Sequence, residues 1–325
     1  MSRTDQPSPS LPWEPGIRPL MLAPMQGLTN RELRAAFAGW ARPDVVYTEY
    51  LRVQTGKRAG LSSHALLEVT ERAAAVPQVT QLIGRDREAL VRAAEAAQQA
   101  GAEHLDLNLG CPFGRLSLRT AGGALLQSGP QVLAPLLVAL RRAISVSFSV
   151  KLRSGFEDPR QIFELAPVLE QAGVDFLVLH PRTVVQRFEG RADHAITAEL
   201  VRRTALPVIA NGDVRSAAQG RAVLEQTGAA GLMIGRGAIR DPLIFERIRG
   251  NIIDDPATEQ RADEVRRFLG ALLPRYAELF SGEDQALYKL KEVLKFIDDE
   301  PLRRTVKKLR KCRSLRRFEA LLAEF

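Results

Sequence analysis

The chain has 325 residues, of which 45% are hydrophobic and 26% are charged, proportions typical of soluble globular proteins. Its two cysteines, Cys111 and Cys312, exclude a disulfide-rich scaffold and a zinc site built from several cysteines. No run of about 18 apolar residues occurs, so we expect no transmembrane helix. The polar, Pro-rich residues 1–17 contain no apolar segment of signal-peptide type and predict a flexible arm on a cytoplasmic protein.

The positive charge is concentrated at the C-terminal end. The net charge is +8, and residues 301–325 alone contain nine Lys or Arg and two Glu, a net of +7. The other 300 residues are therefore close to neutral. This distribution favours a nucleic-acid-binding appendage on a neutral body, although a solvated basic helix face would give the same pattern.

Eight short apolar runs alternate with longer amphipathic stretches along the chain. The runs are rich in Val, Ile and Leu and do not alternate cleanly, which is typical of buried parallel strands. Amphipathic stretches such as residues 86–101 and 158–173 end at a glycine suited to cap a helix. The predicted strands are Leu20–Pro24, Asp44–Glu49, Gln78–Ile83, His104–Leu109, Ser147–Leu152, Asp175–His180, Leu206–Asn211 and Ala230–Gly235.

These units predict an α/β fold, a closed (β/α)8 TIM barrel over residues 18–250. A doubly wound open sheet is the alternative, but it rarely needs eight such regular units. From about Thr258 onward only helical periodicity remains. We therefore expect a small C-terminal helical bundle over residues 256–325, with the basic residues on its last helices.

Polar residues follow the predicted strands, at the end of a barrel where active sites lie. Gly212 after the seventh strand, and the two glycines around Arg236 after the eighth, predict a phosphate site, because backbone N–H groups and the Arg236 guanidinium can both reach phosphate oxygens there. Lys151 suits a Schiff-base amine or an electrostatic partner of a flavin ring, and a salt bridge to Glu49 or Asp106 is the structural alternative. Cys312 lies in a basic helical stretch, and we expect no chemistry there. The full set is Pro24, Met25, Gln26, Glu49, Gln81, Asn108, Cys111, Lys151, Arg153, His180, Arg182, Asn211, Gly212, Asp213, Gly235 and Arg236.

Seven segments stand in the order and spacing of tRNA-dihydrouridine synthases, which the chain resembles from about Leu20 to Ala238 and more loosely beyond. They are LAPMQGLTN, QLIG, DLNLGCP with AGGALL, VKLRSG, HPRT, VIANGD and MIGRGA. The resemblance implies a flavoprotein oxidoreductase that holds FMN in a barrel, takes electrons from NADPH or NADH, and grips tRNA with its C-terminal helices. It also implies reduction of the C5–C6 bond of one uridine, with hydride from flavin N5 to C6 and a proton to C5.

The same resemblance implies roles for individual residues. Cys111 would be the catalytic proton donor, a role that needs a protonated thiol, and an unperturbed thiol pKa of about 8.5 allows this. Asn108, Arg115, Arg153 and Arg182 would contact the substrate. FMN would be held by Pro24, Met25, Gln26, Gln81, Lys151, His180, Asn211, Gly212, Asp213, Gly235 and Arg236.

Two departures from the family pattern and two rival functions remain open. Phe113-Gly114-Arg115 stands where the family often carries two lysines, and Pro181 stands where it often has glycine. One rival is an FMN oxidoreductase acting on a free pyrimidine, which the basic tail disfavours. The other is a tRNA-folding factor with a vestigial flavin site, which Cys111, Lys151 and His180 disfavour. We expect a monomer that binds no metal ion and no membrane.

Overall fold

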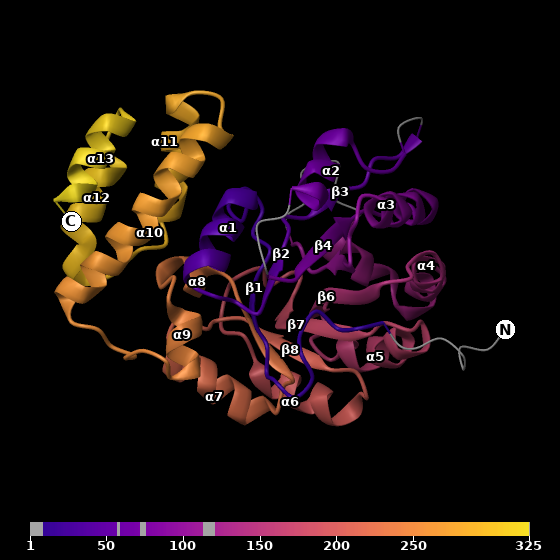
Figure 1. The fold of residues 1–325 in the computed structure, drawn as a ribbon. Helices are drawn as coiled ribbons and strands as arrows, with labels where there is room; N and C mark the ends of the chain where they lie inside the picture. The colour runs from indigo at the N-terminus through magenta and orange to yellow at the C-terminus, as the bar shows by residue number, and fades with distance from the viewer. Residues whose placement is uncertain (1–8, 57–58, 72–75, 113–120, 325) are drawn as a thin grey trace.

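Parallel strand pairing closes the sheet into a ring (Figure 1). In this computed structural model, which describes residues 9–56, 59–71, 76–112 and 121–324, β2 (Val45–Tyr47) pairs with both β1 (Leu20–Leu22) and β4 (Gln78–Ile83). β1 also pairs with β9 (Gly231–Ile234), and the pairings run on through all the neighbours between. Those neighbours are β5 (His104–Leu109), β6 (Ser147–Gly155), β7 (Phe176–Thr183) and β8 (Val208–Asn211). The eight predicted strands and the predicted barrel are confirmed.

One further strand, β3 (Leu51–Arg52), pairs in parallel with the end of β4 without joining the ring. Its two residues are too few to show a periodic pattern, so this strand was not predicted. Helices cover the outside of the ring. They are α1 (Arg31–Trp40), α2 (Ser63–Thr70), α3 (Arg87–Gln99), α4 (Pro130–Ala143), α5 (Gln161–Gln171), α6 (His194–Arg203), α7 (Ala217–Thr227), α8 (Arg236–Arg240) and α9 (Ile244–Arg249), with the 3-10 helix η4 (Gly122–Ser128) after β5.

Side chains fill the barrel, as the alternation of strand faces requires. Met21, Tyr47, Phe176 and Met233 belong to a buried cluster supplied by several strands. Trp13, from the arm that precedes β1, packs edge-to-face on Phe176 with the ring centroids 4.8 Å apart. Phe176 opens β7, so this contact closes the amino end of the barrel and leaves the carboxyl end as the mouth. Residues 1–8 of the predicted arm lie outside the described part of the chain.

The C-terminal region is helical, as predicted. It comprises α10 (Thr258–Leu279), α11 (Glu283–Leu294), the 3-10 turn η5 (Glu300–Leu302), α12 (Arg303–Arg310) and α13 (Leu315–Ala323). Cys312 lies in the connection between α12 and α13, so its assignment to a helix was wrong. The reason is local: the Ser314 hydroxyl accepts a hydrogen bond from the backbone N–H of Arg317 and caps a new helix just beyond it.

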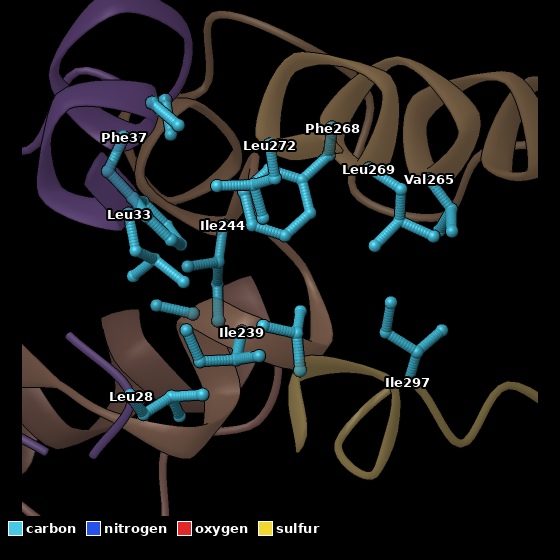
Figure 2. Packing of buried hydrophobic residues seen from close by; sticks show 14 of the residues in the cluster. Leu28, Leu33, Phe37, Ile239, Ile244, Val265, Phe268, Leu269, Leu272 and Ile297 are labelled. Atoms are coloured by element: carbon cyan, nitrogen blue, oxygen red, sulfur yellow. The ribbon is translucent and has the colours of Figure 1, made fainter. Parts of the chain in front are cut away.

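The helices and the barrel share one hydrophobic core. Phe268 of α10 packs edge-to-face on Phe37 of α1 at 5.5 Å and stacks on Trp40 at 5.9 Å. Figure 2 shows the same cluster continuing from Leu28 and Ile239 to Leu272 and Ile297. Because this contact removes apolar area of both helices from water, it holds α10 against α1.

A cluster of ion pairs also restricts how the C-terminal helices dock on the barrel. Arg247 of α9 is buried, and its guanidinium contacts Asp241 at 2.9 Å and also Glu264 of α10. Arg261 of α10 contacts Asp299 at 3.2 Å. A buried charge without its partner costs several kcal/mol, so these pairs favour a single docking of the helices on the barrel.

Replacing Phe268 with alanine tests how much this shared core contributes. The side chain is fully buried between α1 and α10, so Phe268→Ala should lower the free energy of unfolding by about 3–5 kcal/mol. Urea denaturation followed by circular dichroism measures the change. Tyr288→Ala, at a largely exposed position on α11, is the matched control and should change it by less than about 0.5 kcal/mol. Equal losses in both variants would contradict a structural role for the shared core.

Candidate active site

Strands β6 and β8 bring two predicted flavin contacts together. Lys151 Nζ of β6 donates a hydrogen bond to Asn211 Oδ1 of β8 at 3.0 Å, spanning the strand between them. Asn211 Nδ2 donates to the carbonyl oxygen of Met233 at 2.8 Å, which fixes the direction of the amide. Burial lowers the pKa of Lys151 to about 8 against the opposing charge of Asp106. Of the two structural alternatives, Asp106 acts on Lys151 through its charge, and Glu49 instead accepts the backbone N–H of Gly27 at 2.8 Å.

Cys111 lies half-buried at the mouth, directly after β5. Its backbone N–H donates to Asn108 Oδ1 at 2.9 Å, and its carbonyl oxygen accepts from the N–H of Gly123 at 3.2 Å. A Cβ on Gly122 would lie 3.3 Å from that of Cys111, so this glycine allows η4 to pack on the cysteine. The charge of an ionised Cys111 would raise the pKa of Lys151, against the lowering by burial.

The two predicted phosphate loops meet at Asp213. Gly212 has φ +129°, and a Cβ there would lie 2.9 Å from His180 Cδ2, so the loop rests directly on the histidine. The Arg236 guanidinium is half-exposed and lies 3.7 Å from Asp213. The loop after β1 joins them, since a Cβ on Gly235 would lie 3.3 Å from Met25 Sδ. The mouth therefore offers an exposed cation and close backbone approach where the sequence predicts a phosphate.

Arg182, a predicted substrate contact, is only 2% exposed. Its guanidinium donates to both carboxylate oxygens of Asp213, at 3.0 and 2.7 Å, and to His180 Nε2 at 3.0 Å. Because an arginine only donates, His180 Nε2 is the acceptor and the imidazole is neutral. Burial, with the nearby cations adding to it, holds the pKa of His180 well below its ordinary value, which agrees with this. In this structure Arg182 orients His180 and Asp213, and a direct contact with substrate stays a prediction.

Two other predicted contacts are buried rather than open. Gln81 has no exposed surface, and its amide pairs with Asp106 and Asn108. Arg153 donates to the carbonyl oxygens of Gly110 at 2.9 Å and Thr183 at 2.7 Å, and so ties the Cys111 loop to β7. Pro24, Met25 and Gln26 occupy the loop after β1, and Arg115 lies outside the described residues.

Three residues of the mouth were given no place in the predicted site. Asp106, which the sequence suggested only as a salt-bridge partner of Lys151, is buried two residues before Asn108 on β5. Phe188 is 45% exposed, and the guanidinium carbons of Arg153 and Arg236 lie 5.4 and 5.0 Å from its ring centroid. His194 contacts the carbonyl oxygen of Gly212 at 3.0 Å through its Nε2. Phe188 and His194 follow β7, in or just after a long connection. The spacing of the predicted strands does not indicate where residues of such a connection lie.

Metal-ligating side chains do not gather within the described ranges of the chain: no group of three or more His, Cys, Asp or Glu is placed to hold a metal ion. The helices of that same part are also too short or too polar to cross a membrane.

Comparison with known proteins identifies the family. The sequence model described as dihydrouridine synthase (Dus) matches residues 21–322. This chain belongs to the dihydrouridine synthase family. It is similar to a probable tRNA-dihydrouridine synthase of Rhodobacter capsulatus, with 34% identity over 79% of this chain and 81% of that protein. A tRNA-dihydrouridine synthase B of Vibrio parahaemolyticus is 30% identical over 87% of this chain and 92% of that protein.

Solved structures support the fold of this family member. The old yellow enzyme homologue of Zymomonas mobilis superposes with a TM-score of 0.54 at 14% identity, covering 74% of this chain and 91% of that one. Morphinone reductase gives a TM-score of 0.52 at 14% identity, over 74% and 88% of the two chains. At these identities the likeness establishes the barrel alone.

Gly212→Ala tests the close approach of the β8 loop to His180. The new Cβ would lie 2.9 Å from both His180 Cδ2 and Ala192 Cβ, so overpacking adds to the strain of a positive φ. Gly250→Ala is the matched control, because Gly250 also has a positive φ but no neighbour within 4 Å of the new atom. Urea denaturation should show Gly212→Ala to be less stable than Gly250→Ala by about 1–3 kcal/mol. Equal stability of the two variants would show that the loop does not rest on His180.

Proposed function

We propose that this chain is an FMN-dependent tRNA-dihydrouridine synthase that takes its electrons from NADPH or NADH. The observation that carries the proposal is the position of Cys111: its thiol shares one barrel mouth with the buried ammonium of Lys151 and the loops predicted to hold a phosphate. Family membership supplies the reaction class, and the names of the relatives supply tRNA as substrate. We further propose that the protein works in the cytoplasm as a monomer.

The residues of the mouth fit a flavin mononucleotide. Its phosphate would be held by Arg236 and by the backbone of the Gly212 and Gly235 loops, whose glycines leave room for close approach. Its ring would meet Lys151, whose ammonium stabilises negative charge on a reduced flavin. His180 is neutral and would offer a hydrogen bond without adding charge. When bound, FMN supplies the hydride chemistry that the side chains lack.

The chain's own contribution to the reaction is proton transfer and orientation. Cys111 would give its proton to C5 of the uracil, breaking the S–H bond as the C5–H bond forms. The thiolate that remains would be stabilised by the positive charges of Lys151 and Arg153, with which its charge interacts. Asn108, which holds the backbone of Cys111, would contact the reacting base. The target uridine has to leave its stack to reach this mouth.

The basic face of the last helices fits the backbone of an RNA. The nine Lys and Arg of residues 301–325 are all exposed, and they lie on or beside α12 and α13. Phosphate contacts of this kind are insensitive to sequence, so the selection of one uridine would come from how the helices orient the tRNA over the mouth. The shared core of α1 and α10 holds that orientation fixed.

Cys111→Ala separates proton donation from flavin chemistry. The variant should bind FMN and accept electrons from NADPH as the wild type does, because neither step uses the thiol. Dihydrouridine formation in tRNA, measured by mass spectrometry, should fall by about 100-fold or more. Cys312→Ala is the matched control, since Cys312 is buried far from the mouth between α12 and α13, and it should retain activity. Wild-type turnover by Cys111→Ala would refute the proton-donor role, and turnover of free uracil would favour the rival function.

The basic helices are tested in the full chain, because the shared core would be exposed by deleting them. Lys307→Ala, Lys308→Ala and Lys311→Ala together should weaken tRNA binding and lower the slope of log K against log salt by about 2–3. The control removes the same charge from exposed Arg87, Arg92 and Arg142 on α3 and α4, on the opposite side of the molecule (Figure 1). Filter binding at several salt concentrations compares the two. An unchanged slope in the lysine variant, or equal changes in both, would place the RNA elsewhere.

A further inference from the structure

The amide of Asn108 has a fixed direction because of what it contacts. Its Oδ1 accepts the backbone N–H of Gly110 at 3.0 Å and that of Cys111 at 2.9 Å. A backbone N–H only donates, so the atom that faces these two groups is the oxygen. The Nδ2 atom of Asn108 therefore points toward Gln81 and donates to its Oε1 at 2.8 Å.

The same reasoning fixes the orientation of the Gln81 amide and its hydrogen bond to Asp106. Since Gln81 presents its oxygen to Asn108, its Nε2 faces the other way and donates to Asp106 Oδ2 at 2.8 Å. Asp106 Oδ1 completes the chain by accepting the Ser149 hydroxyl at 2.7 Å. Gln81, Asp106 and Ser149 are fully buried, so water does not replace a partner that is removed. Only an acceptor at position 106 satisfies the whole chain.

We propose that Asp106 is a positioning residue for the reaction, which acts through Gln81 to fix the amide of Asn108 beneath Cys111. Both lone-pair directions of Asn108 Oδ1 are then used by the backbone, and one N–H of Nδ2 remains to donate at the mouth, where Asn108 is 7% exposed. A free donor suits a carbonyl oxygen of uracil and opposes the amino group of cytosine. The inference rests on the proposed function, in which Asn108 meets the base and Cys111 protonates it.

The surroundings of Asp106 agree with a role beyond packing. It shares the barrel interior with Tyr47 of β2 and Lys151 of β6, and burial raises its pKa to about 7. A buried carboxyl group costs stability that an apolar residue at the same place avoids. Buried ionisable groups that cost stability are typical of functional sites, where they orient neighbouring groups.

Two substitutions of Asp106 distinguish hydrogen-bond direction from charge. Asp106→Ala removes the acceptor and leaves Gln81 Nε2 unpartnered. Asp106→Asn keeps the chain, because its Oδ1 accepts from Gln81 while its Nδ2 donates to Ser149. Ser147→Ala is the control, because Ser147 lies on the same face of β6 but pairs with His104 at the closed end of the barrel, at 2.7 Å. Gln81→Met preserves the side-chain volume and removes both the amide oxygen and the amide nitrogen. It serves as a second test if Asp106→Ala fails to fold.

The rate to measure is dihydrouridine formation in a single turnover by enzyme whose flavin has been fully reduced beforehand, expressed per bound flavin. Asp106→Ala and Gln81→Met should lower it by about 10- to 100-fold, since misplacement of a reacting group by about 1 Å has effects of that size. Asp106→Asn and Ser147→Ala should stay within about threefold of wild type. The tRNA concentration that gives half the maximal rate should be unchanged in all four, because α12 and α13 hold the tRNA.

Any other result of these measurements would refute either the positioning role of Asp106 or the proposed function. Wild-type rates in Asp106→Ala or Gln81→Met would refute the positioning role. An equal loss in Asp106→Asn would show that the charge matters and the hydrogen-bond direction does not, which also refutes it. Absence of dihydrouridine with the wild-type enzyme would instead refute the proposed function itself, so the two failures are distinguishable.

Discussion

The closure of the sheet is the constraint on which the site depends. β2 has only three residues, yet it pairs with β1 on one side and β4 on the other, and these pairings complete the ring. In a closed parallel ring every carboxyl end faces the same mouth. Lys151 can therefore reach Asn211 across β7, and residues separated by 60 positions in sequence become neighbours. An open sheet would leave the first and last strands at opposite edges.

Positively charged side chains are only partly neutralised at the mouth. Lys151, Arg153 and Arg182 are gathered there with Arg236, and burial lowers the pKa of Lys151 and Arg153. Asp213 neutralises part of this charge through its paired bonds to Arg182. The cations that remain make the mouth electropositive, which suits a phosphate and a reduced flavin far better than a cationic ligand. The electrostatics of the site thus agree with the cofactor that the family resemblance implies.

The sequence predicted the strands and their ends well, for a physical reason. Strands buried on both faces read as continuous apolar runs, so residues such as Asn108 and Lys151 stand out where the runs finish. The side-chain contacts between these polar residues could not be predicted in the same way. The contact of Arg182 with Asp213 depends on how the connections after β7 and β8 fold back, and the burial of Gln81 depends on its neighbours across the sheet. Tertiary contacts of this kind decide whether a polar residue meets ligand or supports another residue.

The helical domain reaches the mouth as well as the outside of the barrel. Lys289 Nζ of α11 donates to the carbonyl oxygen of Gly27 at 2.8 Å, and the N–H of Gly27 donates to Glu49 at 2.8 Å. Asn30, which caps α1, contacts the Tyr276 hydroxyl of α10 at 3.3 Å. The loop after β1, which includes Met25, is therefore bonded to α10 and α11, which belong to the same helical domain as the basic α12 and α13. RNA held by α12 and α13 and a cofactor held by this loop would share one rigid frame, so their distance is set by packing and not by a flexible linker.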